Sequence, residues 1–126
     1  MRRWLFAALA VLMASPAFAA EDDPCVTQRN TIEMNECSRR QMQAAEDNLN
    51  STYRTALASL EKQPGDVKKQ LVQAQRNWIK FRDTNCNAVL AKNADASLRT
   101  VLYLGCMQKL AEERTEHLKL WFLPQH

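Results

Sequence analysis

The sequence predicts an all-α fold, a small antiparallel bundle of three main helices held by two disulfides. Three observations favour this fold. No stretch alternates apolar and polar residues for long enough to form a half-buried strand. Apolar residues instead recur at steps of three or four in three successive stretches, as they do on one face of a helix. The chain of 126 residues contains only 2 Gly but 4 Cys, an even number that allows every thiol to be bridged.

Residues 1–19 are expected to be a signal peptide and not part of the fold. Arg2 and Arg3 precede an apolar run, and a small-x-small cleavage site ends at Ala19. The apolar run is too short to span a bilayer. Cleavage leaves a single mature domain over residues 20–126, with no cysteine at the cleavage site to carry a lipid anchor. We expect a periplasmic protein, with secretion as the alternative.

The charge balance of the mature chain argues against a nucleic-acid partner. The full chain has 17 basic and 14 acidic residues, and loss of Arg2 and Arg3 leaves 15 against 14. A nucleic-acid binder needs a basic stripe to replace the counterions of the phosphate backbone. We expect no such stripe in a chain so close to neutrality.

The first helix is expected to begin after Asn30 and to continue until Pro64-Gly65. Asn30 is a suitable cap, and Glu33 is placed to reach back to it as in a capping box. Pro64-Gly65 then stops the helix, because proline cannot continue it and glycine tolerates a reversed backbone. The residues expected on the core face are Met42, Ala45, Leu49, Tyr53, Ala56 and Leu60.

The second and third helices follow after short turns, which make neighbouring helices antiparallel. The second is expected from about Asp66 to Lys92, with Asn93 in a left-handed conformation behind it. Asp95 or Ser97 is expected to cap the third. The residues expected to face the core are Leu71, Ala74, Trp78, Phe81 and Val89 in the second helix, and Leu98, Leu102, Cys106, Leu110 and Leu118 in the third.

All four cysteines are expected to form disulfides, because they lie in the exported part of the chain. Helix geometry favours Cys25–Cys37 with Cys86–Cys106. If the second hairpin turns near Ala94, Cys86 and Cys106 are offset by roughly 6 Å along the helix axis, against roughly 9 Å for Cys37 and Cys86. Bridged Cα atoms usually lie about 4.4–6.8 Å apart, so the smaller offset is easier to close. A Cys37–Cys86 bridge stays open as the alternative.

No catalytic, metal or cofactor site is predicted. There is no Cys-x-x-Cys pair, and His117 and His126 both lie near the end of the chain. No glycine-rich phosphate loop is present. The carboxylates of Glu112, Glu113 and Glu116 are expected on a solvent face without a nucleophile beside them. The sequence therefore indicates a protein that binds and does not catalyse.

Residues 74–83 form the segment richest in informative side chains. We interpret Trp78 and Phe81 as core anchors. The polar residues expected to hold helix contacts by hydrogen bonds are Gln75, Arg82 and Asp83. The alternative interpretation places Arg76 and Lys80, which are four residues apart on one helix face, against a partner protein.

The closing segment Leu120-Trp121-Phe122-Leu123 is apolar and precedes a proline. We expect it to pack on the bundle. The alternative is a docking patch, since contiguous exposed apolar surface often marks an interaction site.

Four motifs along the mature chain follow the pattern of a known family. They are Glu33-Met34-Asn35-Glu36-Cys37, Leu49-Asn50-x-x-Tyr53, Ala74-Gln75-Arg76-x-Trp78-Ile79-x-Phe81-Arg82-Asp83-x-x-Cys86 and Cys106-x-x-x-Leu110-x-x-x-Arg114-Thr115-x-x-Leu118. With them, the chain resembles the LprI-type lysozyme-inhibitor domain from Cys25 to about Leu118. The residues that carry the pattern are Met34, Asn35, Leu49, Asn50, Tyr53, Gln75, Arg76, Trp78, Phe81, Arg82, Asp83 and Arg114.

The resemblance implies a non-catalytic exported protein that binds lysozyme and inhibits it by forming a stoichiometric complex. Such an inhibitor could offer a basic group to the paired carboxylates of a glycosidase cleft. Lys68, Lys69 and Lys92 lie beside the two turns and are the candidates for this contact. The alternative function is a structural, adaptor or stress-related domain of the envelope that binds an endogenous periplasmic protein.

Overall fold

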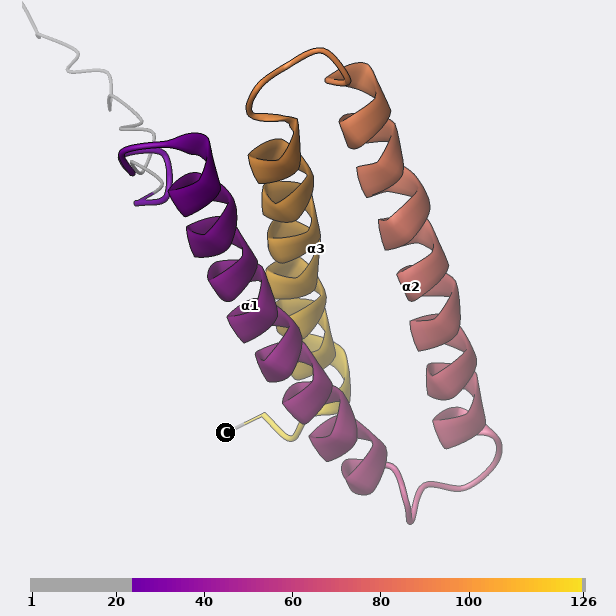
Figure 1. Ribbon diagram of the computed structural model, residues 1–126. Coiled ribbons are helices and arrows are strands. Elements are labelled where there is room, and N and C mark those ends of the chain that lie inside the picture. Colours follow the sequence, from indigo (N-terminus) through magenta and orange to yellow (C-terminus); the bar gives the residue numbers. More distant parts are fainter. Residues whose placement is uncertain (1–23, 126) are drawn as a thin grey trace, which may run out of the picture.

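A computed structural model describes residues 24–125 and shows three helices with no strand in that range. The helices are α1 (Thr31–Ser59), α2 (Val67–Lys92) and α3 (Arg99–Phe122) (Figure 1). The all-α prediction is confirmed. The predicted signal peptide and its cleavage site at Ala19 lie outside the described residues. None of the described helices is long and apolar enough to cross a membrane.

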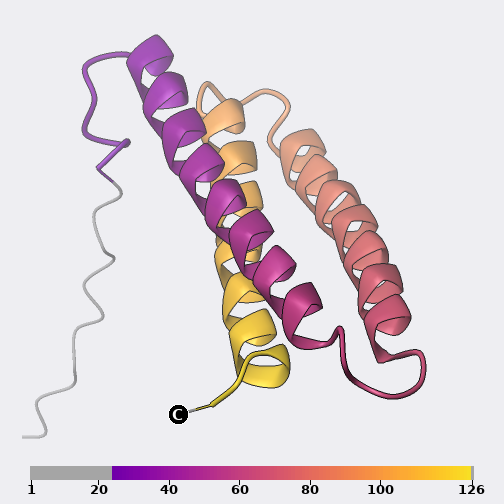
Figure 2. The same cartoon turned by 90° about the horizontal axis from the view of Figure 1, so that it is seen from below.

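The third helix occupies the central position of the bundle. It packs along α1 and also contacts α2, whereas α1 and α2 touch little and diverge from each other (Figures 1 and 2). Consecutive helices are antiparallel, so α1 and α3 run in the same direction. The main interface of the protein is therefore the one between α1 and α3, and α2 is an outer element.

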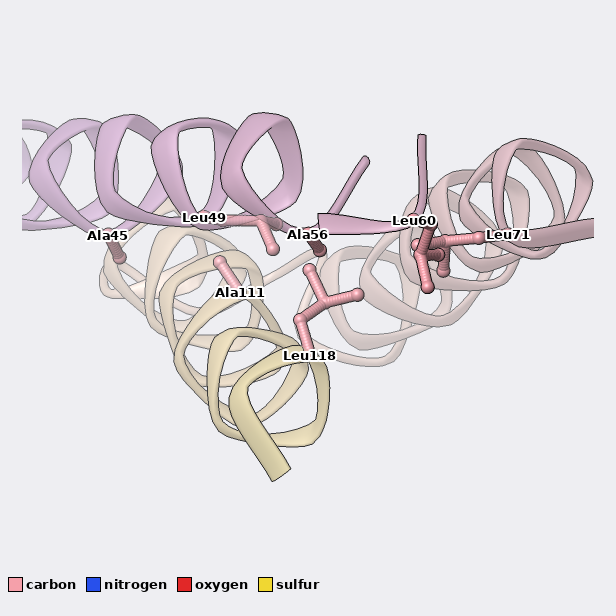
Figure 3. Packing of buried hydrophobic residues seen from close by; sticks show 7 residues of the cluster. All are labelled: Ala45, Leu49, Ala56, Leu60, Leu71, Ala111 and Leu118. Atoms are coloured by element: carbon pink, nitrogen blue, oxygen red, sulfur yellow. The ribbon is translucent and has the colours of Figure 1, made fainter. Parts of the chain in front are cut away.

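The hydrophobic core lies mainly between α1 and α3. Three alanines, Ala45, Ala56 and Ala111, are buried there, and their small side chains allow the two helices to approach closely (Figure 3). Leu49 and Leu118 fill the space between them. The remaining members of the buried cluster are Leu60 and Leu71, with Tyr53, Leu57, Trp78, Phe122 and Leu123 packed against it. Only Leu71 and Trp78 represent α2 in this set.

The start of α1 and the first turn follow the sequence prediction closely. The backbone N–H of Glu33 donates to Oδ1 of Asn30 at 3.0 Å, so Asn30 is the cap. The Glu33 carboxylate reaches one residue further back than in an ordinary capping box and accepts from the backbone N–H of Arg29 at 3.3 Å. In the turn after α1, Gly65 has a φ of +74°, a conformation that other residues rarely adopt.

The second turn differs from the prediction at both of its ends. Asn93 has a φ of −108° and is not left-handed, because its side-chain amide donates to the Val89 carbonyl at 2.7 Å and closes the helix in another way. The cap of α3 is Leu98, without a side-chain cap bond, and not Asp95 or Ser97. Backbone hydrogen bonds within 93–99 and a bond from the Arg99 guanidinium to the Ala94 carbonyl hold this turn instead.

Three residues predicted on the core face are exposed: Ala74, Phe81 and Leu102. Phe81 is 54% exposed and Leu102 43%. On α2 the reason is that contact with α3 covers only a narrow stripe of the helix. On α3 the buried face is rotated by about one residue, and it consists of Val101, Leu104, Met107, Ala111, Thr115 and Leu118.

Both predicted disulfides are present. Cys25 and Cys37 are bridged with a Cα–Cα distance of 5.3 Å, which ties the segment before α1 back onto that helix. Cys86 and Cys106 are bridged with a Cα–Cα distance of 5.7 Å, which ties α2 to α3. The alternative Cys37–Cys86 pairing is excluded.

Candidate functional site

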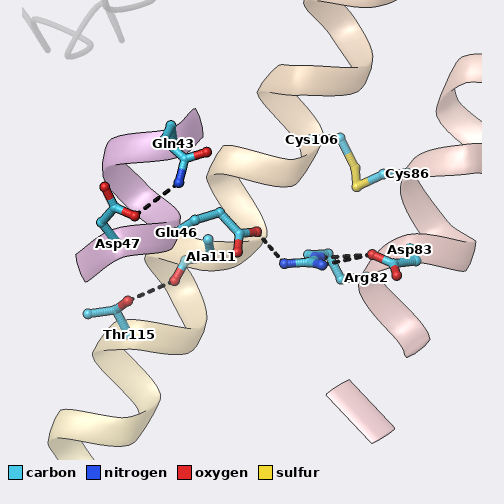
Figure 4. A network of polar contacts seen from close by, with 9 residues as sticks. All are labelled: Gln43, Glu46, Asp47, Arg82, Asp83, Cys86, Cys106, Ala111 and Thr115. Carbon is cyan, nitrogen blue, oxygen red and sulfur yellow. Dashed lines mark hydrogen bonds and ion pairs between the residues drawn. A yellow bond between two sulfur atoms is a disulfide. The ribbon is translucent and has the colours of Figure 1, made fainter. Parts of the chain in front are cut away.

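An ion pair between Glu46 of α1 and Arg82 of α2 links the two helices that diverge (Figure 4). Their side chains are only 19% and 11% exposed. The Arg82 guanidinium also donates to the Asp83 carboxylate, at 3.0 Å from Nε and 2.9 Å from Nη2. On its other side the guanidinium lies 5.3 Å from the ring centre of Trp78, within the range of a cation–π contact. Arg82 is thus fully engaged inside the protein.

A second polar contact joins α2 to α3. Nε of Arg114 donates to Oε1 of Gln75 at 2.9 Å, and Gln75 is only 4% exposed. Burial lowers the pKa of Arg114, and the neighbouring Tyr53 opposes that shift. Nη2 of Arg114 is buried without a hydrogen-bond partner among the described residues, so this guanidinium is also committed to the interior.

These contacts account for most residues of the family pattern. Gln75, Trp78 and Arg82 do hold the helices together, as interpreted from the sequence, whereas Phe81 is not a core anchor. Leu49 is in the core, and Met34 and Asn35 are half-buried near the start of α1. The pattern residues left on the surface are Asn50, Arg76 and Phe81. No interior contact among the described residues explains any of these three.

Arg76 and Phe81 belong to a surface that we call the α2 outer face, defined as Lys69, Arg76, Lys80 and Phe81. All four side chains are exposed. Lys69, Arg76 and Lys80 lie on the side of α2 away from the buried Leu71, Gln75 and Cys86, whereas Phe81 lies on the flank of the helix, about 100° round from Lys80. Phe81 and Lys80 line an open hollow together with Asn77, Thr84, Asn85 and Ala88. A second hollow includes Lys69 and Arg76. One cation, Lys80, therefore shares a hollow with the uncovered ring of Phe81, while Lys69 and Arg76 share the other.

The three turn lysines selected from the sequence do not come together. Lys68 is paired with Glu61 across the first turn. Lys69 and Lys92 are exposed at opposite ends of α2, separated by about 35 Å at the rise of an α-helix. A single cleft on a partner could therefore contact Lys69 or Lys92, but not both.

The closing apolar segment divides into two halves. Phe122 and Leu123 pack against the core cluster, and the Ser59 hydroxyl donates to the Phe122 carbonyl at 2.7 Å. Leu120 and Trp121 are 57% and 72% exposed. The packing prediction is confirmed for the second half and wrong for the first, because Leu120 and Trp121 stay largely exposed. Trp121 lines an open hollow beside Ser59 and Leu60 at the end of α1 but is not covered by them.

Within residues 24–125 the structure brings no three His, Cys, Asp or Glu side chains close enough to hold a metal ion. His117 is exposed, and so are Glu112, Glu113 and Glu116. Among the polar side chains inside the protein, those of Glu46, Gln75, Arg82 and Arg114 make interhelical contacts. Thr115 donates to the Ala111 carbonyl of its own helix, and Asn35 Oδ1 and Ser38 Oγ are buried without a hydrogen-bond partner among the described residues. What remains available to a ligand is the surface, above all the α2 outer face.

The fold and these contacts define the class of protein: a small three-helix bundle whose outer helix is fastened by a disulfide, an ion pair and a buried hydrogen bond. The chain belongs to the lysozyme inhibitor LprI family, whose pattern it matches over residues 22–118. An uncharacterized protein of Rhizobium meliloti strain 1021 is 31% identical over 125 residues, covering 89% of this chain and 90% of the relative. A DUF1311 family protein from Pseudomonas putida KT2440, solved at 1.85 Å, shares the fold with a TM-score of 0.65 at 21% identity, covering 80% of this chain and 99% of that one.

Proposed function

We propose that this protein is exported and inhibits a lysozyme by forming a stoichiometric complex, without catalysing a reaction. The observation that carries the proposal is the family match, which spans residues 22–118 and so includes all three helices except the last turn of α3. Two disulfides among the described residues support export, because such bridges persist in oxidising compartments. The mature form is the domain over residues 20–126, in the periplasm or the medium.

The way the helices are fastened supports binding in a preformed conformation. Arg82, Arg114 and the Cys86–Cys106 bridge hold α2 in place from one side only. The opposite side of α2 is uncovered. A rigid surface loses little conformational entropy when it binds a partner, and this favours tight association without large conformational change.

The test is lysis of a bacterial cell-wall suspension by an animal-type lysozyme, followed by turbidity, with the oxidised protein added in increasing amounts. An inhibitor of this kind protects fully near a one-to-one ratio, and the protection does not decay as a turnover process would. The control is the same protein after reduction and alkylation, for which protection is expected to fall with the loss of the folded state.

Absence of protection by a protein shown to be folded by circular dichroism would contradict the proposal. The alternative, an adaptor domain of the envelope, would then be tested by crosslinking in the producing bacterium and identification of the captured periplasmic protein.

A further inference from the structure

The charge of the protein is distributed unevenly, and most of the positive excess is on α2. This helix carries six basic residues, Lys68, Lys69, Arg76, Lys80, Arg82 and Lys92, and a single acidic residue, Asp83. The prediction that the chain has no basic stripe is therefore wrong. Near-neutral total charge conceals it, because acidic residues outside the three helices offset the cations of α2, namely Glu21, Asp22, Asp23, Glu61, Asp66 and Asp95. The charges within α1 and α3 together cancel.

Two of the six cations are neutralised within the protein. Arg82 is held by Glu46 and Asp83, and Lys68 is held by Glu61. No ion pair among residues 24–125 involves the other four. The positive charge available to a partner is thus that of Lys69, Arg76, Lys80 and Lys92.

Three of these four cations are aligned. Lys69, Arg76 and Lys80 are separated by seven and four residues, which places them on one stripe of the helix. The stripe is about 16 Å long at 1.5 Å per residue. Phe81 follows Lys80 directly and is 54% exposed. It lies about 100° round the helix from the stripe and shares with Lys80 the lining of one hollow.

We propose that the α2 outer face is the surface that contacts lysozyme, and that it binds along the carboxylate-bearing cleft of that enzyme. This inference rests on the proposed function. The clefts of glycosidases hold a pair of carboxylates about which the glycan chain is cleaved. A row of unpaired cations is complementary to such a cleft, and arginine forms strong charge-assisted hydrogen bonds to carboxylates. Arginine is one of the residue types that dominate binding energy at interfaces, and phenylalanine is enriched in them.

The total charges of the two proteins give no long-range attraction, and local complementarity to the cleft can replace it. Animal lysozymes are basic overall, and long-range attraction to a near-neutral protein is absent. Charges separated by more than about 8 Å of solvent are screened at physiological ionic strength. Binding is therefore governed by the groups in contact, where cations of α2 meet carboxylates of the cleft.

The experiment compares two triple variants that remove the same charge from different helices. The test variant is Lys69→Ala, Arg76→Ala and Lys80→Ala on α2. The matched control is Arg39→Ala, Arg40→Ala and Arg54→Ala on α1, three exposed arginines without an ion pair in the described structure. Alanine favours helix at all six exposed positions, so both variants are expected to fold.

The dissociation constant for animal-type lysozyme is measured by titration calorimetry, with helicity checked for each protein. We expect the α2 variant to bind at least about tenfold more weakly, and Phe81→Ala to weaken binding further. We expect the α1 control to change affinity by less than about threefold, since its charges are remote from the contact. A chitin trisaccharide, which occupies the cleft, is expected to compete with the wild-type protein.

The outcomes distinguish failure of this inference from failure of the proposed function. If the wild-type protein binds lysozyme and the α2 variant binds equally well, the surface is wrong and the function stands. If the α2 variant is weakened but the trisaccharide does not compete, the contact lies outside the cleft and this inference is overturned. If the wild-type protein fails to bind, both the function and the inference fall.

Discussion

Arg82 of α2 and Glu46 of α1 form the ion pair that joins the two helices of this bundle that otherwise diverge. The two residues are 36 positions apart in the sequence, and both side chains are largely buried. The position of α2 therefore depends on a few specific contacts more than on hydrophobic burial. Because α2 also carries the proposed binding face, these contacts connect stability to function.

Removal of either member of this pair is expected to destabilise the protein. Arg82→Met leaves the Glu46 carboxylate without its partner in a partly buried site, whereas Glu46→Gln leaves Arg82 with Asp83 as its remaining carboxylate partner. We expect each change to lose about 1–2 kcal/mol of unfolding free energy, with the larger loss for Arg82→Met. The double variant is expected to lose less than the sum of the two, by about 1 kcal/mol, because the second change removes the orphaned charge. Urea unfolding of all four proteins measures this, and strict additivity would show that the pair is not coupled.

The Cys86–Cys106 disulfide is expected to hold α2 against α3, while Cys25–Cys37 is expected to act only near the start of α1. Each closes a short loop, with separations of 20 and 12 residues, and removal of either is expected to cost about 3 kcal/mol in the chain-entropy account. The two bridges are expected to differ in the part of the chain that each one protects from local unfolding. Under native conditions, Cys86→Ala with Cys106→Ala should accelerate amide hydrogen exchange throughout α2.

The matched control for that exchange measurement is Cys25→Ala with Cys37→Ala. In this variant, amide exchange in α2 should rise only by the amount that the loss of global stability causes in the whole protein. Equal acceleration of α2 in both variants would mean that the second bridge has no special role in fastening the outer helix.

The two glycines of the chain provide a paired test of backbone conformation. Gly65 has a φ of +74°, and Gly105 lies inside α3, with no atom within 4 Å of an added Cβ at either position. Gly65→Ala is therefore expected to lose about 1 kcal/mol through backbone strain alone. Gly105→Ala is expected to gain about 0.5–1 kcal/mol, because alanine is the better helix former. Thermal unfolding should shift in opposite directions, and a shift of the same sign would contradict the assigned conformations.

Helices and bridges were predictable here because their signals are local. The spacing of Ala45, Leu49 and Ala56 identifies a buried helix face without reference to its partner. The offset between Cys86 and Cys106 follows from helix rise and turn position. Phe81 and Leu102 were placed wrongly, since periodicity shows that a helix is amphipathic but not how much of its circumference a neighbour covers.

The candidate binding face was only partly visible in the sequence. The spacing of Arg76 and Lys80 places them on one helix face, whereas position beside a turn groups Lys69 with Lys68 and Lys92. The structure separates them, since Lys68 is paired with Glu61 and Lys92 lies at the far end of α2. The total charge of the chain hides the basic helix. Counting the charges of the segment Val67–Lys92 alone reveals it.

The end of α3 contains neighbouring aromatic residues in unlike environments, and substitution is expected to distinguish them. Trp121 is 72% exposed, so Trp121→Ala should change the unfolding free energy by less than about 0.5 kcal/mol. Phe122 packs against the core cluster, and its carbonyl accepts from Ser59 of α1, so Phe122→Ala should lose about 2 kcal/mol by removing buried apolar surface. Urea unfolding measures both, and lysozyme titration of Trp121→Ala adds a second readout. A stable Trp121→Ala protein that binds lysozyme as the wild type does would assign no docking role to this ring, whereas lost binding with retained stability would place the contact at this end of the bundle and contradict the assignment to α2.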